Sequence, residues 1–177
     1  LSNTLLAVKD KLWPKGRKEK FFSVRAVFEA FGINYFEVQN SINQKQYLDR
    51  IRAREPDVII SCNPLIFKEE ILRLPRICCL NRHSALLPSY RGLWPVFQAC
   101  RNGDEHTGVS VHTMDRFIDR GIILAQRKVP IQPSDTVTSL YDKCYQLCAE
   151  ALLEALDRVR RKDFYPHYTN GATPGYY

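Results

Sequence analysis

The sequence contains no apolar run near the length of a membrane-spanning helix, which takes about 20 predominantly apolar residues. It also shows no secretory signal pattern, in which a positively charged segment precedes a short apolar one. We therefore expect a cytoplasmic protein that works without a membrane.

Zinc-finger spacing is also missing, because no pair of cysteines or histidines is matched by a second pair at the required distance. Six cysteines are present, and four of them lie in apolar or helical surroundings, where a free thiol behaves as a small hydrophobic group. Cys144 and Cys148 are four residues apart, so they share one face of a predicted helix. We expect reduced thiols and no metal site.

The composition is that of one sizeable domain, since 45% of the 177 residues are apolar. The net charge of +7 favours anionic partners, and the densest basic groups are at residues 14–20 and 157–163. Two interpretations stay open: both groups are solvated surface, or the first contacts phosphate or nucleic acid. We expect a domain over residues 1–165, followed by a tail or linker over residues 166–177.

Helical and strand patterns alternate along most of the chain. Apolar spacing predicts helices at 1–13, 21–32, 43–55, 67–74, 94–103 and 134–162, and strands at 33–38, 56–61, 76–81, 107–114 and 121–131. Such alternation predicts an α/β fold with a mainly parallel, Rossmann-like sheet flanked by helices. Ligands in such sheets bind at the carboxyl ends of the strands.

Two polar residues stand at one of these ends. Asn81 and His83 close the apolar strand at 76–81 and point to the same side, because side chains alternate along a strand. A third group is available from Asp115 or Asp119, which precede the next strand, and Gly121 permits a tight turn there. A plain alternative is a buried Asn–His pair without function, with Asp119 as a helix cap or ion-pair partner.

The segments NRHSALLPSYRG and TGVSVHTMDRFIDRGIIL, with their spacing, resemble the folate-dependent formyltransferases. The resemblance implies the fold of that family and assigns catalysis to Asn81, His83 and Asp119. It assigns Leu65, Ile66 and Phe67 to a loop beside the pterin of the folate. His112 either approaches the folate as well or is simply packed. Arg91 either orients an anion or is a solvated loop residue.

The implied reaction moves a formyl group from 10-formyltetrahydrofolate to a primary amine, with neither a metal nor a covalent enzyme intermediate. Two kinds of amine acceptor are open. We expect a small molecule, a nucleotide-linked amino sugar, and the alternative is methionyl-tRNA. Two other functions stay open: a hydrolase of the same folate, and a non-enzymatic module that binds nucleic acid. The family begins with a strand and a glycine-containing loop, and neither precedes Leu1, so we expect a truncated amino terminus.

Overall fold

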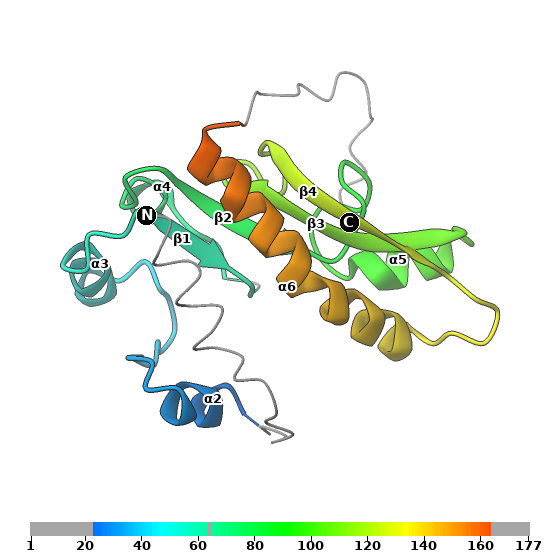
Figure 1. Ribbon diagram of the computed structural model, residues 1–177, viewed down its shortest axis with the longest axis horizontal. Coiled ribbons are helices and arrows are strands. Elements are labelled where there is room, and N and C mark those ends of the chain that lie inside the picture. The colour runs from blue at the N-terminus through cyan, green and yellow to red at the C-terminus, as the bar shows by residue number, and fades with distance from the viewer. Residues whose placement is uncertain (1–22, 64, 164–177) are drawn as a thin grey trace. The chain divides into compact units, whose positions relative to one another are not determined.

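The computed structural model describes residues 23–63 and 65–163, which fall into two compact units divided between Asn40 and Ser41 (Figure 1). In the first unit, helix α2 spans Val24–Ala30, and the Ser23 hydroxyl caps it by accepting the Ala26 N–H. The helix predicted at 21–32 is therefore confirmed with shorter bounds. The helix predicted at 1–13, the basic group at 14–20 and the tail at 166–177 lie outside the described residues.

The strand predicted at 33–38 is wrong, because these residues form no regular element. A strand is stable only when a neighbouring strand takes up its backbone hydrogen bonds, and an apolar run does not supply that neighbour by itself. The four-stranded sheet described for this chain begins further along, in the second unit.

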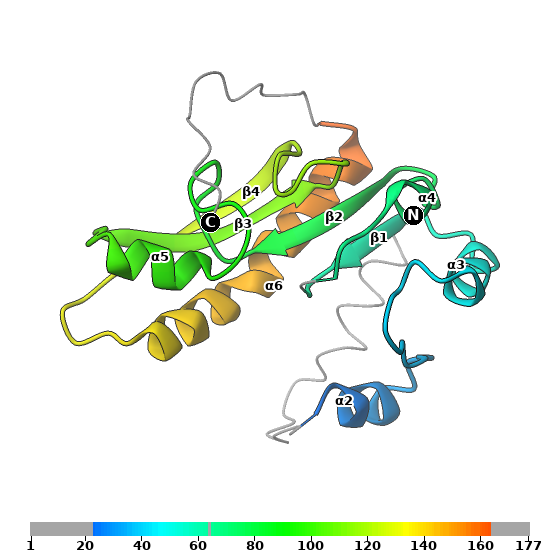
Figure 2. The ribbon, with the colours of Figure 1, turned by 180° about the vertical axis from the view of Figure 1, so that it is seen from behind.

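The second unit contains the sheet and its helices. The chain runs through α3 (Lys45–Arg52), β1 (Val58–Ser61), α4 (Glu69–Leu72), β2 (Cys78–His83), α5 (Pro95–Arg101), β3 (His106–Thr113), β4 (Ile123–Pro130) and α6 (Val137–Arg161). The sheet order is β1-β2-β3-β4, so each strand pairs with the next along the chain (Figure 2). All eight elements had been predicted, with ends that differ by a few residues.

The sheet is mixed rather than mainly parallel, which corrects the prediction. β1 and β2 are parallel, whereas β2 pairs antiparallel with β3, and β3 pairs antiparallel with β4. A parallel pair needs a long crossover, while antiparallel neighbours accept a short connection. The loop between β3 and β4 holds only residues 114–122 and no helix, so β4 returns directly beside β3.

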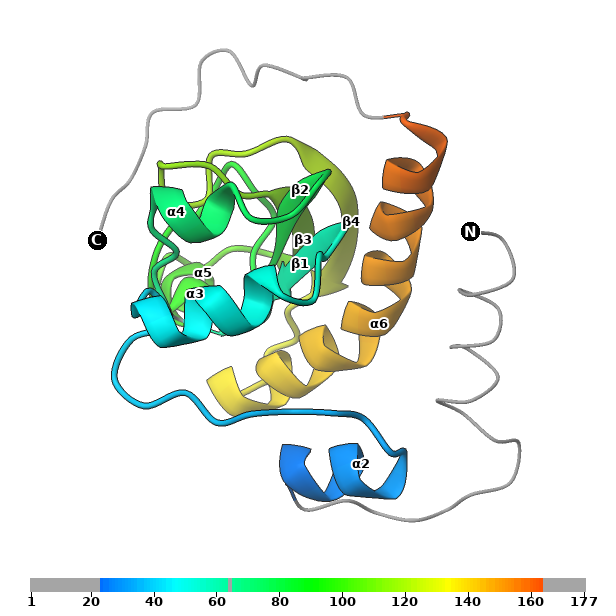
Figure 3. The ribbon, with the colours of Figure 1, turned by 90° about the vertical axis from the view of Figure 1, so that its left-hand side faces the viewer.

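Helix α6 lies across one face of the sheet and closes the core (Figure 3). Its buried side chains recur at helical spacing: Leu140, Cys144, Ala151, Ala155 and Val159. They pack on apolar residues of the strands, which include Leu80, Val109, Val111, Leu124 and Val129. The basic end of α6 is exposed and carries ion pairs between its arginines and acidic residues one turn earlier.

None of the described helices is both long and apolar enough to cross a bilayer.

Within the part of the chain that the structure describes, the register of β1 leaves the end of β2 without a neighbouring strand on one edge. β1 ends at Ser61, which pairs with Asn81. Arg82 and His83 therefore extend past the end of β1, while on the other edge they pair with Val111 and Ser110 of β3. The carboxyl end of the parallel pair is thus open at the place where Asn81 and His83 lie.

The start of α6 provides a test of the fold. Thr136 accepts the Ser139 N–H, and the Ser139 hydroxyl in turn accepts the Thr136 N–H, which forms a reciprocal cap. Thr136→Ala should lower the free energy of unfolding by about 1 kcal/mol, measured by urea denaturation. The control Thr138→Ala, at the exposed second position of the same helix, should change it by a few tenths of that. Equal losses in both variants would contradict the cap.

Candidate active site

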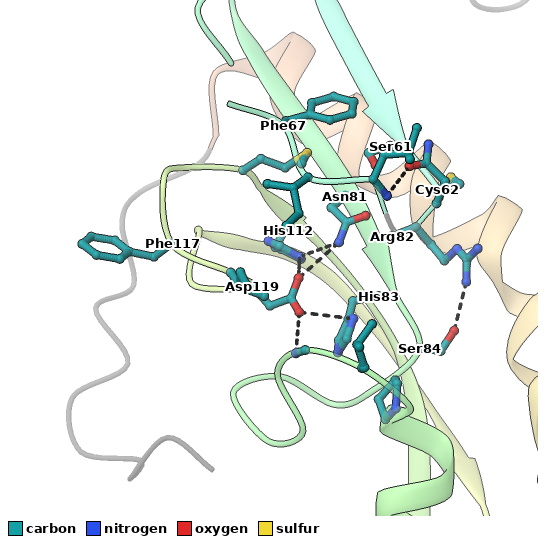
Figure 4. Close-up of a pocket in the computed structure, with 18 of the residues that line it drawn as sticks. Ser61, Cys62, Phe67, Asn81, Arg82, His83, Ser84, His112, Phe117 and Asp119 are labelled. Carbon is teal, nitrogen blue, oxygen red and sulfur yellow. Dashed lines mark hydrogen bonds and ion pairs between the residues drawn. The ribbon is translucent and has the colours of Figure 1, made fainter. Parts of the chain in front are cut away.

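The structure brings Asn81, His83 and Asp119 together (Figure 4). Asn81 and His83 lie on the same face of β2, and Asp119 reaches them from the loop between β3 and β4. The Asn81 amide donates to Asp119 Oδ1 over 3.3 Å, and His83 Nδ1 lies 3.6 Å from Asp119 Oδ2. Asn81 and Asp119 are 38 positions apart in the chain, so their proximity is produced by the fold.

The loop between β3 and β4 is shaped to present Asp119. Asp119 has a left-handed backbone with φ +50°, a conformation that aspartate adopts more readily than most residues. Gly121 follows, and a Cβ atom there would collide with the Thr113 carbonyl. The other candidate, Asp115, accepts the Phe117 N–H over 2.7 Å and shapes the same loop. Of the two acids, Asp119 is therefore the one that meets Asn81 and His83.

The segment after β2 holds Asp119 from the other side. The Gly92 N–H donates to Asp119 Oδ2 over 2.8 Å, and Arg91 Nε donates to the Asp119 backbone carbonyl over 3.1 Å. Arg91 therefore anchors the loop that carries the carboxylate, a role that neither of its two predicted interpretations included. Gly92 was not predicted as a site residue, because a backbone N–H leaves no signal in the sequence.

Asp119 is ionised at neutral pH. Burial of its side chain raises the pKa, but a hydrogen bond with His112, the nearby His83 and the Gly92 N–H outweigh this effect and lower the pKa to about 2. The carboxylate is 10% exposed, so its charge acts with little screening by solvent. An ionised, nearly buried carboxylate can accept a proton or stabilise a neighbouring cation.

The hydrogen bond to Tyr90 selects the tautomer of His83. His83 Nε2 lies 2.7 Å from the Tyr90 carbonyl oxygen, which can only accept, so Nε2 carries a proton. Tyr90 is itself held by its hydroxyl group, which donates to Asp104 over 2.6 Å. Burial lowers the pKa of His83 against the opposing effect of Asp119. The neutral ring therefore presents its lone pair on Nδ1, toward Asp119.

His112 belongs to the same polar group. It is buried on β3 in register with Asn81, and its Nδ1–H donates to the Thr113 carbonyl over 2.7 Å. Its Nε2 lies 3.3 Å from the Asn81 amide nitrogen and 3.4 Å from Asp119 Oδ1. Asn81 and Asp119 thus both lie within reach of this one ring nitrogen. The structure places His112 against these two residues, and its predicted folate contact stays a prediction.

A cavity of about 520 Å³ opens beside this group. Leu65, Ile66 and Phe67 form part of its wall, as does the loop between β3 and β4 through Phe117 and Ile118. Ile66, Phe117 and Ile118 are each at least half exposed, an uncommon placement for large apolar side chains in one small region. This end of the cavity therefore offers apolar surfaces suited to a flat aromatic ring.

Asn43 positions the apolar loop, although no pattern in the sequence marked it as a site residue. Its amide donates to the Ile66 carbonyl over 2.8 Å, and its amide oxygen accepts the Lys68 N–H over 2.8 Å. The two bonds fix the backbone on both sides of Phe67. Within the described part of the chain, no cluster of three potential metal ligands occurs.

The Formyl transferase family matches residues 4–156 of the chain. The chain belongs to this family. Methionyl-tRNA formyltransferase of Thermotoga maritima is 36% identical over 152 residues, which cover 85% of this chain and 48% of that relative. The chain spans about half the length of the curated relatives it matches.

Solved structures of the formyl transferase family share the fold. Glycinamide ribonucleotide transformylase 1 of Geobacillus kaustophilus superposes with a TM-score of 0.66 at 26% identity, over 80% of this chain and 77% of that one. A sugar N-formyltransferase of Shewanella sp. superposes with a TM-score of 0.67 at 22% identity, over 97% of this chain and 69% of that one. The α/β formyltransferase fold implied by the sequence motifs is thereby confirmed.

The electrostatic contact between His83 and Asp119 can be tested directly. The Asp119 carboxylate raises the pKa of His83, so Asp119→Asn should move that pKa further below its ordinary value. Nitrogen NMR of the imidazole against pH measures this pKa and also reports whether Nε2 carries the proton in the neutral ring. The control Asp157→Asn, on the exposed end of α6, should leave both unchanged. A His83 pKa that rises in Asp119→Asn would contradict the geometry.

Proposed function

We propose that this protein transfers a formyl group from 10-formyltetrahydrofolate to a primary amine. The observation that carries the proposal is the meeting of an amide, an imidazole and an ionised carboxylate at the wall of a cavity whose other wall is apolar. Membership of the formyl transferase family supports it.

In this proposal the apolar end of the cavity binds the pterin of the donor. Leu65, Ile66 and Phe67 contact the ring, and Asn43 keeps their backbone in place. The exposed apolar groups fit a flat bicyclic ring, whose binding removes them from water. The formyl group then lies near Asn81 and His83.

Asn81 polarises the formyl group. The carbonyl oxygen gains negative charge when the amine attacks, and donors aimed at that oxygen stabilise the transition state. Asn81 can turn one amide N–H from His112 or Asp119 toward the oxygen. Losing one such donor typically costs about 3 kcal/mol of transition-state stabilisation.

Asp119 and His83 carry out the proton transfers. The attacking amine must lose a proton, and the leaving nitrogen of the folate must gain one. His83 Nδ1 carries a lone pair, and Asp119 stabilises the imidazolium that forms when Nδ1 takes a proton. Asp119 can also accept the proton itself, directly or through a water molecule. Either route leaves the proton next to the reacting carbon, ready for the leaving group.

For the acceptor, the similarity to methionyl-tRNA formyltransferases over 85% of this chain favours methionyl-tRNA. The amino-sugar acceptor expected from the sequence stays the second candidate, supported by the fold shared with a sugar N-formyltransferase. Both acceptors offer a primary amine next to a phosphate-bearing body.

The deciding experiment mixes the protein with 10-formyltetrahydrofolate and follows tetrahydrofolate release by absorbance. Methionyl-tRNA, nucleotide-linked amino sugars and no amine are compared. Release that requires one amine confirms transfer and identifies the acceptor. Release without any amine identifies a hydrolase instead. No release from the full-length protein with any acceptor would refute the proposal.

Asp119 gives the sharpest mutational test. Asp119→Asn removes the ionised carboxylate but keeps the size of the side chain and a partner for the Gly92 N–H. We expect kcat to fall about a hundredfold or more, which is the range for loss of an acid–base group. Affinity for a stable 10-formylfolate analogue should change little. The control Asp115→Asn, in the same loop, should keep most of the activity. Full turnover in Asp119→Asn would remove this residue from the mechanism.

A further inference from the structure

Arg82 separates the two proposed catalytic residues of β2 but points the other way. Asn81 and His83 face Asp119, whereas Arg82 faces helix α6 (Figure 4). Its guanidinium lies 5.0 Å from the ring centroid of Tyr145 on α6, and its Nη1 donates to the Ser84 hydroxyl over 2.9 Å. The strand thus carries a cation directly behind the proposed reaction centre.

One cavity joins the two faces of β2. Because β1 ends opposite Asn81, no strand among the described residues covers that edge of Arg82 and His83. The cavity that holds the Asn81–Asp119 group continues round this open edge and is also lined by Arg82, Ser84, Cys62, Tyr141 and Tyr145. It therefore has an apolar end on one face of β2 and a polar, cationic end on the other.

The Arg82 guanidinium has N–H donors at that end of the cavity beyond the one that bonds to Ser84. Among residues 23–63 and 65–163, no carboxylate forms an ion pair with it, and Ser84 takes one of its five N–H donors. Asp119, an acid of the same cavity, is turned to the opposite face and already bonded to Gly92 and Asn81. A planar guanidinium fixed over an aromatic ring and lacking a carboxylate is suited to a phosphate.

We propose that Arg82, with the Ser84 hydroxyl beside it, binds a phosphate group of the amine acceptor. This inference rests on the proposed function, in which the donor pterin occupies the apolar end near Phe67 and Phe117. The reacting carbon lies at Asn81, between the two ends, so the amine arrives from the end that Arg82 lines. Both candidate acceptors carry phosphate, and the assignment is the same for either.

The test measures inorganic phosphate binding to the protein by isothermal titration calorimetry at constant ionic strength. The unaltered protein should bind phosphate, and Arg82→Gln should weaken binding about tenfold to a hundredfold, as expected for lost charge-assisted hydrogen bonds. The phosphate affinity of Arg82→Lys should lie between those of the unaltered protein and Arg82→Gln, because lysine keeps the charge without the planar guanidinium. The matched control is Arg116→Gln, which removes a cation at the other end of the cavity, 4.7 Å from the Phe117 ring. It should leave phosphate affinity unchanged.

Absence of phosphate binding in the unaltered protein, or equal losses in Arg82→Gln and Arg116→Gln, would overturn the proposal. A second arm tests whether the anion comes from the donor, by titrating 10-formylfolate analogues with and without the glutamate. Unchanged affinity of Arg82→Gln for both, which also shows that the variant is folded, supports an acceptor phosphate. If Arg82→Gln loses affinity only for the glutamate-bearing analogue, that assignment is overturned. Phosphate binding is measured without turnover, so it can succeed even if formyl transfer fails.

Discussion

The site depends on one buried carboxylate. Asp119 is placed where water solvates it poorly, which would ordinarily favour its neutral form, and the structure compensates with hydrogen bonds from Gly92 and Asn81 and with two neighbouring imidazoles. These partners come from three separate segments: β2, the turn after it and β3. Stabilising one charge therefore requires that all three segments take their positions together, and the same requirement assembles the proposed reaction centre.

The neighbouring imidazoles are fixed by backbone carbonyls rather than by the carboxylate. Tyr90 holds Nε2 of His83, and Thr113 holds Nδ1 of His112, so each ring directs its other nitrogen into the polar group. A carbonyl acceptor cannot change its protonation state, which makes each tautomer independent of the charge on Asp119. The proton-accepting atom of His83 is therefore set by the fold before any substrate arrives.

The sequence predicted the elements and the three central residues better than it predicted their arrangement. Alternation along a strand placed Asn81 and His83 on one side, and the family motifs supplied Asp119. The predicted direction of the strands was wrong, because helical and strand periodicities carry no information about whether the chain returns parallel or antiparallel. Asn43 was missed for a related reason: it acts on a loop 23 residues away, and no local pattern marks such a contact.

The two faces of β2 carry the two proposed functions of the cavity, formyl transfer on one face and phosphate binding on the other. Residues 81 and 83 share a face because side chains alternate, and residue 82 is directed to the opposite face by the same rule. The backbone hydrogen bonds of β2 with β3 do not involve these side chains, so a substitution at position 82 leaves that pairing in place. Chemistry and acceptor recognition can then be set separately by adjacent residues of one strand. This separation depends on β1 ending at Ser61, since a longer β1 would cover the edge round which the two ends of the cavity meet.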